Sequence, residues 1–232
     1  MGSALLALAG LRAFWGFLSF GTGLFVLATI VQEYAGGMRV WMGRGSRGPG
    51  GALVALVRRN QRRYGGYIIH GGVVLVFAGI TSVGLWKQET SRLLHPGDSV
   101  DLAGHTIVYR DFWVQSTPHR KVEGVRLLVR DRAGRDLREM LPERSFFATF
   151  PDEPVSEIAL FSRLRGDLYA VSEEVLPDGS ARVHLFWNPL IALIWIGGIV
   201  MALGTVIAVL PSRLPEPVRA TVPENATGLV AG

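Results

Sequence analysis

Residues 64–86 have the sequence YGGYIIHGGVVLVFAGITSVGLW, and this stretch decides the fold. It is long and apolar enough to form the ~20 residues of helix that cross a bilayer core. His70 is its only side chain that titrates near neutral pH. Because an ionisable group inside a membrane is costly, His70 is a candidate functional residue. Two other roles stay open, namely bracing a neighbouring helix by a hydrogen bond or reaching water near the membrane surface.

A glycine pattern runs through the same stretch. Gly65, Gly72 and Gly79 recur every seven residues and would form a smooth stripe along one helix face. Such a stripe lets another helix, or a flat ligand, approach the backbone closely. The stripe need not lie on the face of His70. Imidazole is also a common axial ligand of haem iron, although a single histidine does not establish a haem site.

The composition of the whole chain indicates a membrane protein. Of its 232 residues, 49% are hydrophobic, and they are clustered into long runs. The chain has no cysteine, which excludes disulfides, cysteine-ligated metals and thiol nucleophiles. The net charge of +5 is concentrated in one loop between two apolar runs, where it predicts membrane topology. We therefore expect no nucleic-acid partner.

These features divide the chain into six segments and predict a mainly α-helical membrane protein with three transmembrane helices and an inserted extracytoplasmic all-β domain. The loop of residues 35–65 holds seven arginines and no acidic residue, so the positive-inside rule places it in the cytoplasm. The segments are a first transmembrane helix (1–34), a basic cytoplasmic loop with an amphipathic helix (35–65), a second transmembrane helix carrying His70 (66–86), the β-domain (87–187), a third transmembrane helix (188–210) and a disordered cytoplasmic tail (211–232).

The insertion of residues 87–187 has the pattern of a small barrel or sandwich of five to eight strands. Its segments HTIVYRDFWV, GVRLLVR, VSEIALF, DLYAVSEEV and ARVHLFW are rich in β-branched and aromatic residues, and HPGD, DRAGRD and LPDGS separate them as turns. Its histidines lack the spacing of a metal site, and no serine elbow, phosphate loop or dinucleotide fingerprint occurs. The domain is therefore expected to be a docking surface.

The third apolar run begins WNPLIALIWIGG. Asn188 and Pro189 suit the cap and first turn of a helix. Small residues four apart predict tight packing against another helix, and they are Gly198 with Ala202 and Gly204 with Ala208.

Four segments, in this order, resemble the C-terminal third of the cytochrome c maturation F family, a membrane haem lyase. They are RRNQRRYGGYIIHGGVVLVFAGI, HPGDSVDLAGHTIVYRDF, SEIALFSRLRGDLYAVSEE and WNPLIALIWIGGIVMALG. The resemblance covers about residues 58–210. Its most specific pair is the YGGY…H motif with the WNP…WIGG…MALG motif.

The resemblance implies a function in the bacterial inner membrane, with residues 87–187 on the periplasmic side. The family joins haem, delivered by a haem chaperone, to exported apocytochrome c together with thiol-handling partners. It also holds a resident haem b that quinol is thought to reduce, and His70 matches one of the two axial ligands of that iron. The second axial histidine and the tryptophan-rich WWD loop belong to an earlier portion of the family. This chain has no WWD motif, so it is expected to need that N-terminal portion, in the same or a separate chain, besides membrane lipid.

Arg62, Arg63 and Tyr67 are candidate contacts to the haem or to quinol. The two arginines precede His70 by seven or eight residues, a rise of ~10–12 Å along a helix, and would pair with acidic ligand groups at the cytoplasmic edge. Binding of lipid by a topogenic loop also explains these arginines. Two other functions stay open for the whole chain: a cofactor-free membrane scaffold whose β-domain docks maturation partners, and a quinol-oxidising cytochrome b subunit without lyase activity.

Overall fold

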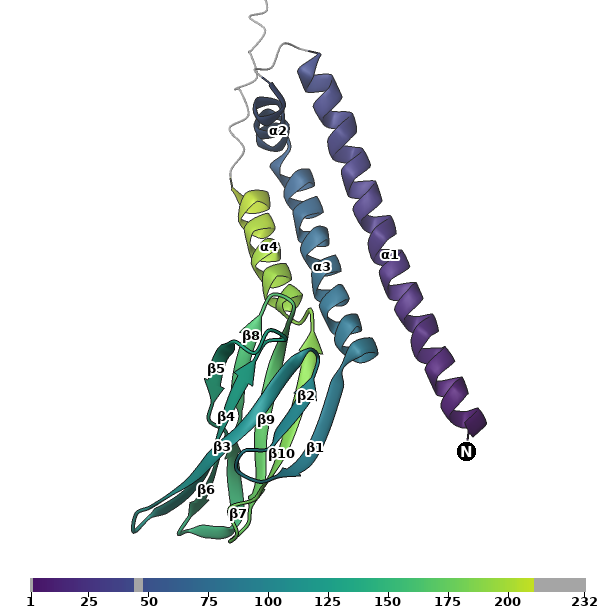
Figure 1. Cartoon of the computed structure of the whole chain (residues 1–232). Coiled ribbons are helices and arrows are strands. Elements are labelled where there is room, and N and C mark those ends of the chain that lie inside the picture. The colour runs from purple at the N-terminus through teal and green to yellow at the C-terminus, as the bar shows by residue number, and fades with distance from the viewer. Residues whose placement is uncertain (1, 44–47, 211–232) are drawn as a thin grey trace, which may run out of the picture.

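A computed structural model describes residues 2–43 and 48–210 of the chain. Helices gather at one end and a two-layered β-domain at the other (Figure 1). The helices are α1 (Gly2–Met42), α2 (Gly48–Arg59), α3 (Gln61–Trp86) and α4 (Ala192–Val209). Within the described part, three helical segments are long and apolar enough to cross a membrane, and they are Ala13–Met42, Gln61–Trp86 and Ala192–Val209. The proposed tail of residues 211–232 lies outside the described residues.

Helix α1 continues to Met42, so the first residues of the predicted basic loop (35–65) are helical. The reason is that α2 folds back on the end of α1. A Cβ atom on Gly37 would lie 2.7 Å from both the Leu56 side chain and the Tyr64 hydroxyl. Ala52 and Leu56 are the buried residues of α2, as an amphipathic helix requires.

Helices α3 and α4 pack backbone to backbone along the predicted glycine stripe. A Cβ atom on Gly72 would lie 2.7 Å from the carbonyl oxygen of Gly197, and one on Gly65 would lie 2.7 Å from that of Gly204. The expectation for α4 was wrong in one respect. Gly198 has nothing within 4 Å of its Cβ position, and the contact residues Gly197 and Gly204 are seven apart, which matches the spacing on α3.

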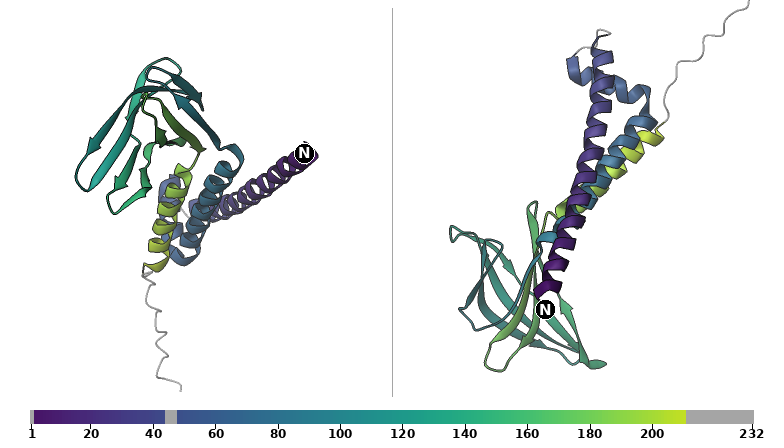
Figure 2. Two further views of the ribbon diagram at one scale, coloured as in Figure 1. Left: turned by 90° about the horizontal axis from the view of Figure 1, so that it is seen from below. Right: turned by 90° about the vertical axis from the view of Figure 1, so that its right-hand side faces the viewer.

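The β-domain is a sandwich of two antiparallel sheets (Figure 2). One sheet has the order β1-β10-β9-β8, and the other has the order β2-β3-β4-β6-β7 with β5 paired to β4. The strands are β1 (Gln88–Leu94), β2 (Ser99–Leu102), β3 (His105–Ser116), β4 (Arg120–Arg130), β5 (Asp136–Met140), β6 (Glu143–Phe147), β7 (Phe150–Glu157), β8 (Ala159–Arg163), β9 (Gly166–Val175) and β10 (Ala181–Pro189).

The expected number of strands, five to eight, was too low for two reasons. Short polar strands such as β2 and β5 lack the β-branched and aromatic enrichment that predicts strands. The segment VSEIALF also forms parts of two strands, because the chain leaves one sheet after Glu157 and joins the other at Ala159. The alternation in ARVHLFW is confirmed, since Ala181, Val183, Leu185 and Trp187 are buried.

The start of the third helix differs from the expectation. Asn188 and Pro189 continue strand β10, where they pair with Asp167 and Gly166 of β9. Leu190 then turns the chain with a φ of 55°, and Ile191 is the N-cap of α4. Ser82 of α3 donates a 2.6 Å hydrogen bond to the Pro189 carbonyl oxygen, which fixes this strand-to-helix junction against α3.

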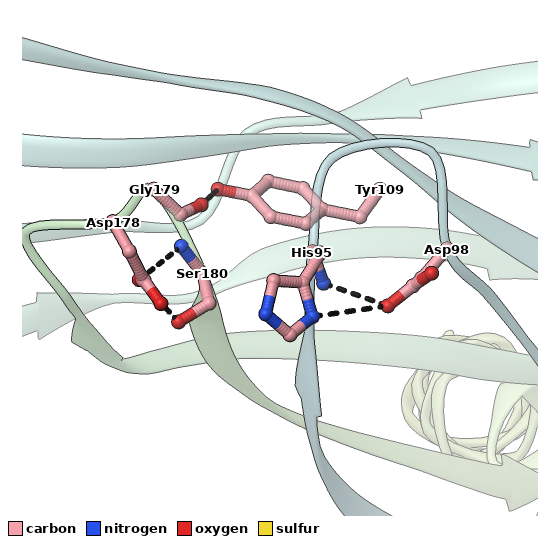
Figure 3. Close-up of polar contacts among 6 residues, drawn as sticks. All are labelled: His95, Asp98, Tyr109, Asp178, Gly179 and Ser180. Carbon is pink, nitrogen blue, oxygen red and sulfur yellow. Dashed lines mark hydrogen bonds and ion pairs between the residues drawn. The ribbon is translucent and has the colours of Figure 1, made fainter.

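Tyr109 links the two sheets through the core of the sandwich. Its side chain is fully buried, and its hydroxyl donates a 2.9 Å hydrogen bond to the Gly179 carbonyl in the β9–β10 turn (Figure 3). Ser180 donates to the Asp178 carboxylate from its amide and its hydroxyl, which holds this turn in place. Burial, with smaller contributions from the Asp111 and Asp178 carboxylates, raises the pKa of Tyr109 to about 12.

Replacing Tyr109 with phenylalanine should lower the free energy of unfolding at pH 7 by about 1–2 kcal/mol, because the Gly179 carbonyl loses its buried donor. The raised pKa adds a pH signature. The contribution of neutral Tyr109 is fully present below pH 10.0 and is lost as the pH rises toward 12. The free energy of unfolding, measured with urea, should therefore fall more between pH 8 and pH 11 for the wild type than for Tyr109→Phe. Equal losses would contradict this assignment.

Candidate functional site

His70 lies on α3 with one ring nitrogen held by the helix itself. Its Nδ1 is 2.8 Å from the carbonyl oxygen of Gly66, one turn earlier. A carbonyl oxygen only accepts, so Nδ1 donates, and in the neutral ring Nε2 carries the lone pair. The side chain is exposed within the chain as described. This arrangement is that of metal-ligating histidines, whose second nitrogen donates to a fixed carbonyl or carboxylate.

His70 lines an apolar groove of about 360 Å³ between α1 and α3. Ser19 of α1 and Thr81 of α3 join the two helices by a hydroxyl–hydroxyl bond of 2.7 Å. Trp15 and Phe77, at 58% and 59% exposed, leave the groove open on its outer side. Its other lining residues are Leu18, Ser19, Thr22, Gly23 and Val26 of α1 with Val73 and Val74 of α3.

The glycine stripe and His70 belong to different faces of α3. Gly72 contacts α4, whereas His70, about 200° away around the helix, lines the groove toward α1. The stripe therefore serves helix packing, and the His70 face keeps a groove. The sequence left open whether the stripe and His70 share a face, and the structure separates them.

The residues of the groove fit one axial side of a haem. An apolar lining with a single imidazole suits a porphyrin face and its iron. The chain holds five histidines, and the other four lie in the β-domain. Among the described residues there is no cluster of three or more histidine or acidic side chains that could hold a metal ion. A second axial imidazole would thus have to come from outside this chain.

Near the start of α3, Arg63 and Tyr67 lie on the same face of the helix as His70. The Nε of Arg63 donates to the Tyr67 hydroxyl at 2.9 Å, and the guanidinium forms an ion pair with Glu33 of α1. The rings of Tyr34 and Tyr67 are tilted against each other, with centroids 6.2 Å apart. The sequence prediction named Arg63 and Tyr67 but missed Glu33, although it is the only acidic residue before the β-domain.

Arg62 lies elsewhere on the helix surface. It is exposed, and within the described part of the chain no hydrogen bond or ion pair of its side chain is found. The sequence placed Arg62 and Arg63 together, whereas the structure gives a partner only to Arg63. Of these two arginines, Arg62 is therefore the one that stays available to a ligand.

The histidines of the β-domain have local partners or lie in turns. His95 contacts the Asp98 carboxylate at 3.5 Å within the β1–β2 turn (Figure 3), and His184 lies 3.4 Å from Glu173 on the neighbouring strand. His119 is exposed beside the β3–β4 turn. His105 packs against Trp187, with ring centroids 5.2 Å apart.

Comparison with known proteins agrees with this architecture. Residues 85–189 match the family model described as the CcmF C-terminal beta-sandwich. The β-domain of this chain is thus similar to the C-terminal β-sandwich of the CcmF family. The matched segment is the β-domain with its junctions to α3 and α4, so the expected resemblance is confirmed.

Relatives of the CcmF family extend this match into the helices. The cytochrome c-type biogenesis protein NrfE of Haemophilus influenzae is 30% identical over 65% of this chain and 24% of its own length. The cytochrome c-type biogenesis protein CcmF of Pseudomonas aeruginosa is 27% identical over 98% of this chain and 34% of its own length. The chain thus spans about a quarter to a third of the curated relatives it matches.

A solved structure titled Cytochrome c Heme Lyase CcmF has the same fold. It aligns with a TM-score of 0.54 and 19% identity, covering 80% of this chain and 34% of that one. At this identity the alignment supports the arrangement of helices and sandwich.

Proposed function

We propose that this chain supplies one axial ligand, His70, to a haem b in the membrane domain of a cytochrome c haem lyase. The observation that carries the proposal is the hydrogen bond between His70 and its own helix. Its Nδ1 bonds the Gly66 carbonyl, so Nε2 is the nitrogen left for iron at an open apolar groove. A bound haem b would supply electron transfer, and two imidazole ligands would leave no open position for oxygen.

The cytoplasmic end of the groove would hold the polar edge of the haem. Arg62 has a free guanidinium for a propionate. Arg63 and Tyr67 would orient the same edge through their mutual hydrogen bond, while Glu33 ties Arg63 to α1. Quinol, as the proposed reductant, would approach from this lipid-exposed side.

The rest of the lyase would come from a WWD-bearing N-terminal portion, in this chain's own full protein or in a partner chain. That portion would supply the opposing imidazole and the site for haem delivered by a haem chaperone. We place the basic segment before α3 in the cytoplasm and the β-sandwich on the periplasmic side of the bacterial inner membrane, in accord with the positive-inside rule. There the sandwich would meet apocytochrome c and its thiol-handling partners.

The test is the reduced absorbance spectrum of the protein purified with its N-terminal portion. After dithionite reduction the wild type should show a b-type spectrum, and His70→Ala should lose most of it, since one of two iron ligands is gone. His119→Ala, which removes an exposed histidine of the β-domain, is the matched control and should keep the spectrum. An unchanged spectrum in His70→Ala would remove His70 from the site.

A cofactor-free scaffold is the second candidate, because the sandwich exposes large apolar side chains. Phe150, Val155 and Leu160 are 63%, 51% and 47% exposed. If the wild type shows no haem at any purity and still binds the maturation partners, this second function replaces the first.

A further inference from the structure

A basic pocket lies at the helix-facing end of the sandwich. Its volume is about 510 Å³, and the β2–β3, β4–β5 and β8–β9 turns form its walls. Four arginines line it together with a single acidic residue, Asp131. They are Arg132, Arg135, Arg163 and Arg165.

Three of these arginines have no counter-charge. Asp131 is committed to Arg135, whose Nη2 lies 2.6 Å from the carboxylate. Arg132, Arg163 and Arg165 are exposed and form no ion pair within the described ranges 2–43 and 48–210. The pocket thus concentrates unpaired positive charge, although nine other ion pairs occur in the described part of the chain, most of them in this domain.

His105 also lines the pocket, and this positive charge affects its pKa. Its burial, together with the Arg163 and Arg132 guanidinium groups, lowers the pKa of the imidazole below its usual range, against backbone hydrogen bonds that act in the other direction. In its neutral form, His105 contributes an uncharged polar side chain to the lining of the pocket. The potential in the pocket therefore favours an anion.

The position of the pocket relative to the membrane follows from the backbone. The Leu190 amide donates a 3.0 Å hydrogen bond to the Arg165 carbonyl oxygen, and α4 begins at Ala192. The β8–β9 turn thus lies beside the start of a membrane-spanning helix (Figure 1). Leu164, between the two arginines of this turn, is 76% exposed. An apolar side chain flanked by cations at this depth suits the boundary between lipid headgroups and acyl chains.

We propose that this pocket binds the phosphate of an anionic phospholipid headgroup in the outer leaflet. Arg132, Arg163 and Arg165 would hold the phosphate by charge-assisted hydrogen bonds. Leu164 would enter the acyl region beside it. The exposed leucine is what favours lipid over free phosphate, because a soluble anion gains nothing from an adjacent apolar side chain. This proposal needs no haem; its outer-leaflet placement alone rests on the topology given with the proposed function, so failure of the haem assignment would leave it intact.

The test is a titration of the purified full chain in detergent, in which the midpoint of thermal unfolding is measured at each concentration of the added probe. The probes are short-chain phosphatidylglycerol, phosphatidylcholine of the same chain length, and inorganic phosphate. The wild type should be stabilised saturably by phosphatidylglycerol, because a ligand that binds only the folded state raises the midpoint. The triple variant R132Q/R163Q/R165Q should bind it at least about tenfold more weakly, since several charge-assisted hydrogen bonds are lost.

The matched control is R92Q/R110Q/R138Q, which removes the same charge from exposed, unpaired arginines of this domain that do not line the pocket. It should bind phosphatidylglycerol like the wild type. Leu164→Ser should weaken phosphatidylglycerol binding and keep the unfolding midpoint without lipid. Equal loss in both triple variants, equal stabilisation by phosphatidylcholine, or stabilisation by inorganic phosphate at the same concentrations would each overturn the proposal. So would a triple variant that binds lipid normally but no longer copurifies with the N-terminal portion.

Discussion

Replacing Gly197 with leucine should separate α3 from α4 and cost more than about 3 kcal/mol of unfolding free energy. The usual cost of overpacking, about 1–3 kcal/mol, applies where side chains can move aside. Here a Cβ atom on Gly197 would lie 2.6 Å from the Gly72 carbonyl oxygen and 3.0 Å from the Val76 amide nitrogen. Because the obstacle is backbone, one helix must shift as a whole. The measurement is the thermal unfolding midpoint of the detergent-solubilised chain, followed by tryptophan fluorescence.

The neighbouring glycine provides the control. Gly198 has nothing within 4 Å of its Cβ position, so Gly198→Leu adds the same side chain on a face that can take it. Its unfolding midpoint should stay near that of the wild type. If the two variants have equal midpoints, α3 and α4 do not meet along Gly72 and Gly197.

Truncating Leu127 to alanine should cause the second large loss of unfolding free energy, in this case in the sandwich. Leu127 lies in β4, has no exposed surface and packs in the core between the two sheets. Replacement of a fully buried leucine by alanine costs about 2–5 kcal/mol, because the lost apolar contact is joined by the cavity left behind. Urea unfolding monitored by near-ultraviolet circular dichroism should show the midpoint falling, with little change in slope.

Leu160→Ala is the matched truncation on β8. That side chain is 47% exposed, so its removal leaves no enclosed cavity and should cost less than about 1 kcal/mol. A Leu127→Ala variant as stable as Leu160→Ala would contradict the arrangement of the core.

The sequence predicted the helices and most strands because their patterns are local. The run of residues 64–86 needs only its own length and apolarity to indicate a membrane helix. The alternation in ARVHLFW likewise depends on β10 alone. The sheet change at Ile158 and the continuation of β10 through Asn188 and Pro189 depend on partners far along the chain. Ordinary capping preferences pointed to a helix start there, and pairing with β9 overrode them.

The sequence pointed to His70 as the candidate residue, but it did not predict which residues and helices surround it. A histidine in an apolar helix draws attention by itself. Which side of α3 His70 occupies follows from Gly72 packing on α4, and glycine spacing alone did not say which helix it met. The role of Glu33 needed the antiparallel pairing of α1 and α3, because its partner Arg63 lies thirty residues away.

The sandwich is joined to the α3–α4 pair by two connections, one of a single residue and one of two residues. Strand β1 follows α3 after Lys87, β10 precedes α4 by two residues, and β1 pairs with β10 from Gln88↔Trp187 onward. Ser82 closes the same junction from α3. Because these two short connections lead to adjacent, paired strands, the sandwich cannot rotate freely about either of them. A docking protein that tilted the sandwich would therefore move α3 with it as a rigid body, and would change the orientation of His70 toward α1.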